Sequence, residues 1–427
     1  MKPGLAEPPS PSSTPRPWAE GRGRAASWPL LAAVAAAILG LAWLILGLAT
    51  LPDSKAWGFD FAAYHGAASR LADGLGLYAA RSLSGPFEPT SAGLYLYPPP
   101  FAVGMLPLAA VPLESATAAW YVFHVLALAA ACALLPVRPV IRVAGFAVTA
   151  LAFAVVRDLA LGNVSVMLLV PLAITWRWLD RPAGSLAMAL TIAVKPTTAI
   201  YLAWWALRRR WWALGWCLAG GAVILLVTLP LVGVQSYLDY LTMLRNVSGV
   251  TGAPGNLDLG STMVRLGLTE PLPTLAYLGG VIAAAVAVIA SLRRDREVGF
   301  MVTLGASLLL SPLLWDHYLA ALLLPATFLA QRGRPWALLL PLLTWLPAVA
   351  LPAVVLAAML LPFLARDAGD PPSPRKSLMR PRWQGRPPPR RGSHPGVASC
   401  RLPGHGLRIH AQARAQQRTH HRPDPAG

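Results

Sequence analysis

An uncharged apolar run near the N-terminus constrains this chain most strongly. Residues Trp28 to Leu51 form a stretch of 24 residues without a charged side chain. As a helix, such a stretch crosses about 30 Å of hydrocarbon. A cleaved signal peptide has a shorter apolar core and a polar mature chain after it, whereas further apolar segments follow here. We therefore predict a retained first membrane span, preceded by a disordered cytoplasmic tail at residues 1–27.

The rest of the chain repeats this apolar pattern up to residue 365. Pro107 and Pro112 interrupt the segment 99–113, which makes it a short or re-entrant piece. We predict an all-α polytopic membrane domain over residues 28–365, with about 10–13 transmembrane or re-entrant helices. The expected apolar segments lie at 99–113, 116–136, 140–156, 164–179, 184–207, 212–233, 272–291, 298–313, 317–331, 335–348 and 350–365.

Composition and charge exclude two broad classes of protein. With 56% hydrophobic and 13% charged residues, the chain is not an ordinary cytosolic enzyme. The net charge of +18 would indicate a nucleic-acid partner if it were spread evenly, but residues 366–427 hold 13 Lys and Arg against 3 acids. We therefore expect no nucleic-acid partner. The basic tail is either a disordered arm attracted to anionic lipids or an out-of-frame end of the coding sequence.

Basic clusters between the apolar segments determine the expected topology. Arg181 and the run 208–210 flank the segment 184–207, and both should be cytoplasmic by the positive-inside rule. A segment that begins and ends on one side must turn back within the membrane. The Lys195-Pro196 pair at its centre breaks a helix, so we predict two half-helices that meet at Lys195 beside a cavity.

Two long polar segments, 52–98 and 234–270, are expected as external loops. The first carries Asp60 between two aromatic residues. Partial burial would raise the pKa of this carboxyl toward a value that suits a general base. Alternatively, Asp60 is a solvated acid that caps a helix over residues 61–71. Acceptor recognition, if the protein has any, is expected in 234–270.

Further polar residues are expected on the external side. Lys195 could bind an anion such as a lipid phosphate, or its side chain could simply extend to the interface. His317 could contact a phosphate, or belong to an interfacial aromatic belt together with its neighbour Asp316. Arg157 could bind a membrane-level phosphate, or be neutralised by Asp158.

The sequence lacks the motifs of several other mechanisms. It contains no phosphate-binding glycine loop, dinucleotide fingerprint or paired zinc-binding histidine motif, and its three cysteines have no metal-ligand spacing. No nucleotide cofactor is therefore expected, and no divalent metal is implied.

The ordered motifs resemble those of glycosyltransferase family 87, polyprenol-phosphate-mannose-dependent α-mannosyltransferases of the GT-C superfamily. The resemblance covers about residues 28–365. The motifs are Asp60, Gly76-Leu77-Tyr78, Tyr97-Pro98-Pro99-Pro100, Gly162-Asn163, Lys195-Pro196, Arg209-Arg210-Trp211, and Ser311-Pro312 followed by Trp315-Asp316-His317. Relatives often have Gln at the position of Asn163.

The resemblance implies a GT-C-like bundle and an enzyme active on the external face of the cell membrane. It implies a polyprenyl-phosphate-linked hexose, mannose in the family, as the donor, and a glycolipid or glycan as the acceptor. Asp60 would be the catalytic base of an inverting transfer, and Lys195, His317 and Arg157 would bind the donor phosphate. Tyr97, Asn163 and Asp316 are expected to bind substrate.

The main alternative is a secondary transporter, because transporters also use broken helices and buried ions near the midplane. Two long external loops and the lack of a convincing internal repeat favour the enzyme. A non-catalytic multi-span protein is the remaining possibility, although it leaves an intramembrane lysine unexplained.

Overall fold

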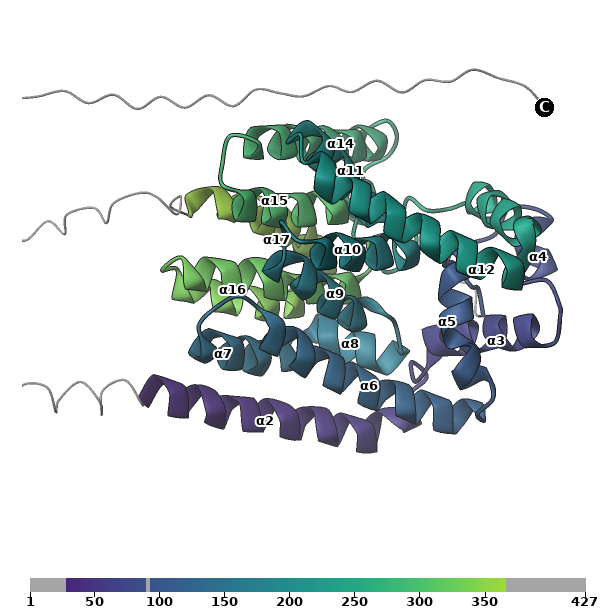
Figure 1. Cartoon of the computed structure of the whole chain (residues 1–427), viewed down its shortest axis with the longest axis horizontal. Helices are drawn as coiled ribbons and strands as arrows, with labels where there is room; N and C mark the ends of the chain where they lie inside the picture. The colour runs from purple at the N-terminus through teal and green to yellow at the C-terminus, as the bar shows by residue number, and fades with distance from the viewer. Residues whose placement is uncertain (1–27, 90–92, 366–427) are drawn as a thin grey trace, which may run out of the picture. The chain divides into compact units, whose positions relative to one another are not determined.

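The structure is a computed structural model that describes residues 28–89 and 93–365. The expected tails at 1–27 and 366–427 lie outside the described residues. Within the described ranges the elements are helices, and no strand is present. The longer helices (Figure 1) are α2 (Trp28–Thr50), α3 (Phe59–Ala72), α5 (Pro99–Ala109), α6 (Leu113–Leu134), α7 (Pro139–Ala150), α8 (Phe153–Leu161), α9 (Ser165–Arg177), α10 (Pro182–Val194), α11 (Ile200–Leu207), α12 (Trp211–Asn246), α14 (Leu272–Ser291), α15 (Arg296–Leu309), α16 (Leu323–Gln331) and α17 (Leu351–Leu360).

Short elements connect these helices. They are α4 (Ala80–Leu83), α13 (Leu259–Arg265) and the 3₁₀ turns η1 (Leu51–Asp53), η2 (Pro196–Ala199), η3 (Asp316–Leu322), η4 (Pro335–Trp345), η5 (Ala348–Ala350) and η6 (Leu361–Leu364). Proline begins α5, α7 and α10. Its fixed φ suits the first turn, and the N–H that it lacks has no helical partner there. The helix expected at 61–71 is confirmed as α3.

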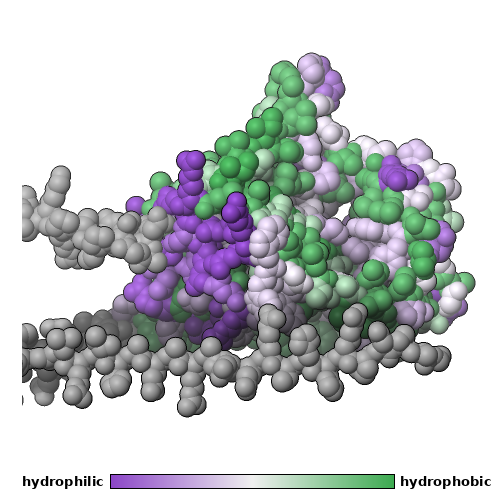
Figure 2. Space-filling model, turned by 45° about the horizontal axis from the view of Figure 1, so that its top comes forward, coloured by the Kyte–Doolittle hydropathy of each residue, from purple (hydrophilic) through white to green (hydrophobic). Residues whose placement is uncertain are grey.

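Among the described residues, four helices are long and apolar enough to cross a membrane: α2 extended to Asp53, α6, α12 and α14. Large apolar side chains remain exposed on them, for example Leu39 on α2, Leu226 on α12 and Ile282 on α14. Figure 2 shows hydrophobic residues across much of the visible face and hydrophilic residues gathered mainly toward one end. Such a surface is compatible with lipid rather than water. The predicted all-α polytopic membrane protein is therefore confirmed.

The remaining apolar pieces are shorter, and several of them are buried inside the bundle. Nearly every residue of α15 and α16 is buried. The expected single segment 140–156 is instead a pair, α7 and α8, bent by 63°. Both Arg157 and Asp158 therefore lie on α8 and not in a connecting loop; Asp158 is buried, whereas the Arg157 side chain is 41% exposed. The segment 99–113 holds the 11-residue α5, too short to span the membrane alone.

The predicted break at Lys195 is confirmed. Helix α10 ends at Val194, Lys195 leaves the helical conformation (φ −131°, ψ 89°), and η2 leads into α11. Both ends of this segment lie on one side, because Asp180 contacts Arg210, 3.3 Å away, and also Arg296. The basic turns expected on one side thus meet there.

The position of Lys195 along the bundle follows from α10. The helix has 13 residues and begins beside the basic turns. With a rise of 1.5 Å per residue, Lys195 lies about 20 Å from those turns.

Candidate active site

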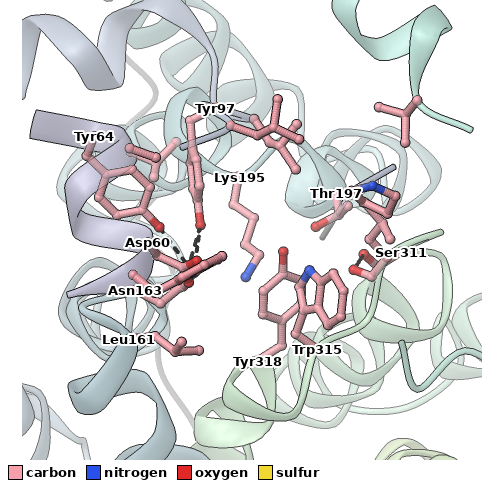
Figure 3. Close-up of a pocket in the computed structure, with 18 of the residues that line it drawn as sticks. Asp60, Tyr64, Tyr97, Leu161, Asn163, Lys195, Thr197, Ser311, Trp315 and Tyr318 are labelled. Atoms are coloured by element: carbon pink, nitrogen blue, oxygen red, sulfur yellow. Dashed lines mark hydrogen bonds between the residues drawn. The ribbon is translucent and has the colours of Figure 1, made fainter. Parts of the chain in front are cut away.

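A cavity of about 680 Å³ lies where α3, the α8–α9 junction, the break after α10 and the start of η3 meet. Its size is typical of pockets that bind small molecules. Polar side chains from distant parts of the sequence line it, among them Asp60, Tyr97, Arg157, Asn163 and Lys195. Figure 3 shows most of these groups facing the same space. The sequence had predicted these five residues, and the structure brings them together.

Asp60 lies in the first turn of α3 and faces Asn163. The Asn163 Nδ2 atom donates a hydrogen bond to Asp60 Oδ2 at 2.7 Å (Figure 3). The same amide nitrogen lies 3.1 Å from the Tyr64 hydroxyl and 3.2 Å from the Tyr97 hydroxyl. The alternative role for Asp60 is wrong, because Gly58 occupies the N-cap position and no side chain caps the helix.

The orientation of the Asn163 amide is fixed by the backbone around it. Its Oδ1 atom accepts hydrogen bonds from the N–H groups of Val164, at 2.8 Å, and Ser165, at 3.2 Å. A backbone N–H can only donate, so the atom that it faces must be the oxygen. The NH₂ group of Asn163 therefore points to Asp60, where it stabilises the carboxylate form.

Gly162 explains why α8 ends beside α3. Its φ of +65° is in the left-handed region, which a side chain disfavours. A Cβ atom at this position would lie 2.7 Å from the Cβ of Phe61. Only glycine lets the α8–α9 junction approach α3 closely enough to bring Asn163 against Asp60.

The surroundings of Asp60 change its acidity. Burial raises the pKa of the Asp60 carboxyl above its ordinary value, because the charged form loses water contacts. The charge of His317, the hydrogen bond from Asn163 and the charge of Arg157 oppose this shift. A carboxylate with a raised pKa is a stronger base than a solvated one, which suits proton abstraction.

Lys195 faces Asp60 across the cavity. Its Nζ atom lies 2.8 Å from the centre of the Tyr318 ring and 3.3 Å from Ser165 Oγ. Figure 3 shows the side chain extended into the cavity between Asn163 and Tyr318. No carboxylate of the described residues forms an ion pair with it. The amino group is thus held by an aromatic face and a hydroxyl, and an anion bound in the cavity would give its charged form a partner.

The two charged residues at 157 and 158 have different partners. The predicted alternative, an Arg157–Asp158 pair, is wrong: Arg157 Nε lies 3.8 Å from Asp316 Oδ2, and Asp158 is buried beside His124. Adjacent residues of a helix point in different directions. Arg157 therefore lines the cavity with Asp316 beside it, while Asp158 belongs to the protein interior.

His317 lies elsewhere than expected. Its side chain is buried and packs against Tyr318, with ring centres 4.9 Å apart. Its neighbours Trp315 and Tyr318 line the cavity instead. A direct contact between His317 and a donor phosphate would require these side chains to move. His317 therefore does not line the cavity in this structure.

Several aromatic cavity residues were given no role from the sequence, among them Tyr64, Trp315 and Tyr318. Tyr64 follows Asp60 by four positions on α3, one helical turn later. This spacing was the feature of the sequence that could have indicated that Tyr64 lies beside Asp60. Trp315 lies in a recognised motif and Tyr318 directly follows it, but nothing in the sequence indicates which of these side chains face the cavity.

Comparison with known proteins identifies the family. The model of glycosyltransferase family 87 matches residues 95–312. This chain belongs to glycosyltransferase family 87. No curated protein and no solved structure matches it. As a family 87 member the chain is a membrane glycosyltransferase, and the transporter and non-catalytic alternatives are set aside. The match includes Asn163 and Lys195, whereas Asp60 precedes it.

Proposed function

We propose that this family 87 enzyme transfers a hexosyl residue, mannosyl by analogy with the family, from a polyprenyl-phosphate donor to a hydroxyl of a glycolipid or glycan. The observation that carries the proposal is the placement of a carboxylate, Asp60, and an ammonium, Lys195, on the wall of one cavity. The first can remove a proton and the second can bind a phosphate.

The proposed reaction is a direct displacement with inversion. Asp60 takes the proton of the acceptor hydroxyl as that oxygen attacks the anomeric carbon. The bond between this carbon and the phosphate oxygen breaks, and its electron pair leaves with the polyprenyl phosphate. Lys195 and Arg157 stabilise the negative charge that develops on the phosphate. Asn163 orients Asp60 throughout, and no step requires a metal.

The position of the cavity supports a lipid-linked donor on the external face. Lys195 lies about 20 Å from the basic turns, at a depth that a polyprenyl phosphate can reach from within the membrane. Apolar side chains, such as Phe59, Leu161 and Leu244, also line the cavity. They offer the first isoprenoid units an environment similar to that of the lipid chains.

The acceptor is expected to meet the segment 234–270. From this segment, Tyr240, Leu244, Val247 and Pro254 reach the cavity wall. The first three lie on or just after the last turns of α12, which continues through a break at Gly233. We therefore expect acceptor choice to depend on this end of α12 and the residues after it.

A transfer assay tests the proposal. The purified full chain in lipid vesicles is given radiolabelled polyprenyl-phosphate mannose and an extract of membrane glycolipids, with polyprenyl-phosphate glucose and a nucleotide-linked mannose in parallel reactions. The proposal predicts labelled glycolipid from a lipid-linked sugar. Transfer from the nucleotide sugar alone would overturn it.

A further inference from the structure

His124 on α6 is surrounded by oxygen atoms that can only accept hydrogen bonds. The side chain is completely buried. Its Nδ1 atom lies 2.8 Å from the carbonyl oxygen of Trp120, and its Nε2 atom contacts the carbonyl oxygen of Asn163. A neutral imidazole has one N–H and one bare nitrogen. In either tautomer, a bare nitrogen would face a carbonyl oxygen, so both bonds require the imidazolium form.

The charge of this imidazolium has a buried partner. Asp158 Oδ2 lies 3.3 Å from His124 Nε2, and neither side chain is exposed. An isolated charge in the protein interior is very unfavourable, whereas a paired and hydrogen-bonded one is tolerated. The two residues thus satisfy each other's charge within the bundle.

Asp158 also holds the start of α9. Its Oδ1 atom accepts a hydrogen bond from the N–H of Ser165, at 3.2 Å, and its Oδ2 atom accepts one from the N–H of Val166, at 3.0 Å. These N–H groups have no partner within the helix, and the positive end of the helix dipole favours a carboxylate there.

The junction between α8 and α9 is therefore held from two sides. His124 binds the backbone carbonyl of Asn163, and Asp158 binds the first N–H groups of α9. Between these points lies the Asn163 side chain, whose amide is directed at Asp60.

We propose that His124 and Asp158 form a buried ion pair that positions the Asn163 amide and, through it, the carboxylate of Asp60. The proposal rests on the proposed role of Asp60 as the base. Neither His124 nor Asp158 lines the cavity, so they are positioning residues and not catalytic ones. A displacement of about 1 Å at a reacting group can reduce a rate about 100-fold, which makes such support necessary.

The protonation of His124 is measured without any transfer assay. Full-length protein labelled with ¹⁵N-histidine is observed by solid-state NMR in lipid vesicles, and the signal of His124 is identified by its loss in His124→Gln. The proposal predicts a proton on both ring nitrogens at neutral pH. A bare nitrogen would overturn the ion pair.

Kinetics then test the positioning role. His124→Gln and Asp158→Asn each leave a buried charge without its partner, so each is expected to lower kcat about 10- to 100-fold. The donor KM should change less than about twofold, because neither side chain touches the substrate. The double variant removes both charges and should be no worse than the more damaging single variant.

Tyr121→Phe is the matched control. Tyr121 lies on the same helix, and its hydroxyl donates to the carbonyl of Leu44, away from the α8–α9 junction. This variant should lose thermal stability but keep its kcat. Multiplicative losses in the double variant, or an unchanged kcat in folded single variants, would overturn the positioning role.

The two proposals fail in different ways. A doubly protonated His124 in a protein that transfers no lipid-linked sugar leaves the ion pair standing and overturns the proposed function. Transfer of a lipid-linked sugar by a protein whose His124 has a bare nitrogen overturns the ion pair and leaves the proposed function standing.

Discussion

Replacement of Gly162 by alanine is expected to damage both stability and transfer. The left-handed φ of +65° costs an alanine about 1–2 kcal/mol. The new Cβ would also lie 2.7 Å from the Cβ of Phe61, and such overpacking costs about 1–3 kcal/mol more. The free energy of unfolding should therefore fall by about 2–5 kcal/mol.

If α3 moves to relieve the close contact between the added Cβ and Phe61, the active site changes as well. Phe61 lies in the first turn of α3, and its neighbour Asp60 accepts the hydrogen bond from Asn163. If α3 moves away from the junction, Asp60 and Asn163 separate. We expect the kcat of Gly162→Ala to fall about tenfold or more.

Gly267→Ala is the matched control for this prediction. Gly267 has a similar φ of +79°, but nothing lies within 4 Å of the Cβ that alanine would add. This variant therefore incurs only the backbone cost of about 1–2 kcal/mol. Thermal unfolding in detergent and transfer of radiolabelled sugar are measured for both. Equal losses of Tm, or an equal kcat, would refute the argument that close approach at Gly162 shapes the site.

Two further predictions concern the charged groups of the cavity. Lys195→Met should raise the donor KM and lower kcat, so that kcat/KM falls about 100-fold. Lys195→Arg keeps the positive charge and should retain part of the activity. An unchanged kcat/KM in Lys195→Met would exclude the phosphate contact. Since burial raises the pKa of Asp60 above its ordinary value, kcat/KM should fall as the pH drops through this raised pKa. Asn163→Leu removes a hydrogen bond that lowers the pKa of Asp60, so this variant should lose kcat/KM at a higher pH than the wild type. A pH profile that is the same in Asn163→Leu would contradict the assigned contact.

Much of the architecture could be predicted from hydropathy and charge. The break at Lys195 was predictable because basic turns on both sides of one short apolar segment require it to turn back, and proline supplies the break. The helix after Asp60 was likewise evident from its pattern. Contacts between side chains far apart in the sequence could not be predicted from hydropathy and charge. That Asn163 would bind Asp60 depends on how closely two helices approach at Gly162.

The partners of charged residues that are adjacent in the sequence were the hardest feature to predict. Arg157 and Asp158 suggest a neutral pair in a linear sequence, but a helix turns them to different neighbours. Similarly, His317 lies in the interior while Tyr318 lines the cavity. The direction of each side chain depends on helix rotation and packing, which the sequence alone does not specify.

In the proposed mechanism, Asp60 is the base of the sugar transfer. The most direct test compares Asp60→Asn with Asp73→Asn, since Asp73 is an exposed acid at the other end of the same helix. Single-turnover transfer from radiolabelled polyprenyl-phosphate mannose is measured in both folded variants. We expect Asp60→Asn to be slower by about 10²–10⁴-fold and Asp73→Asn to equal the wild type. Transfer by Asp60→Asn at a rate within a few-fold of the wild type would contradict the account.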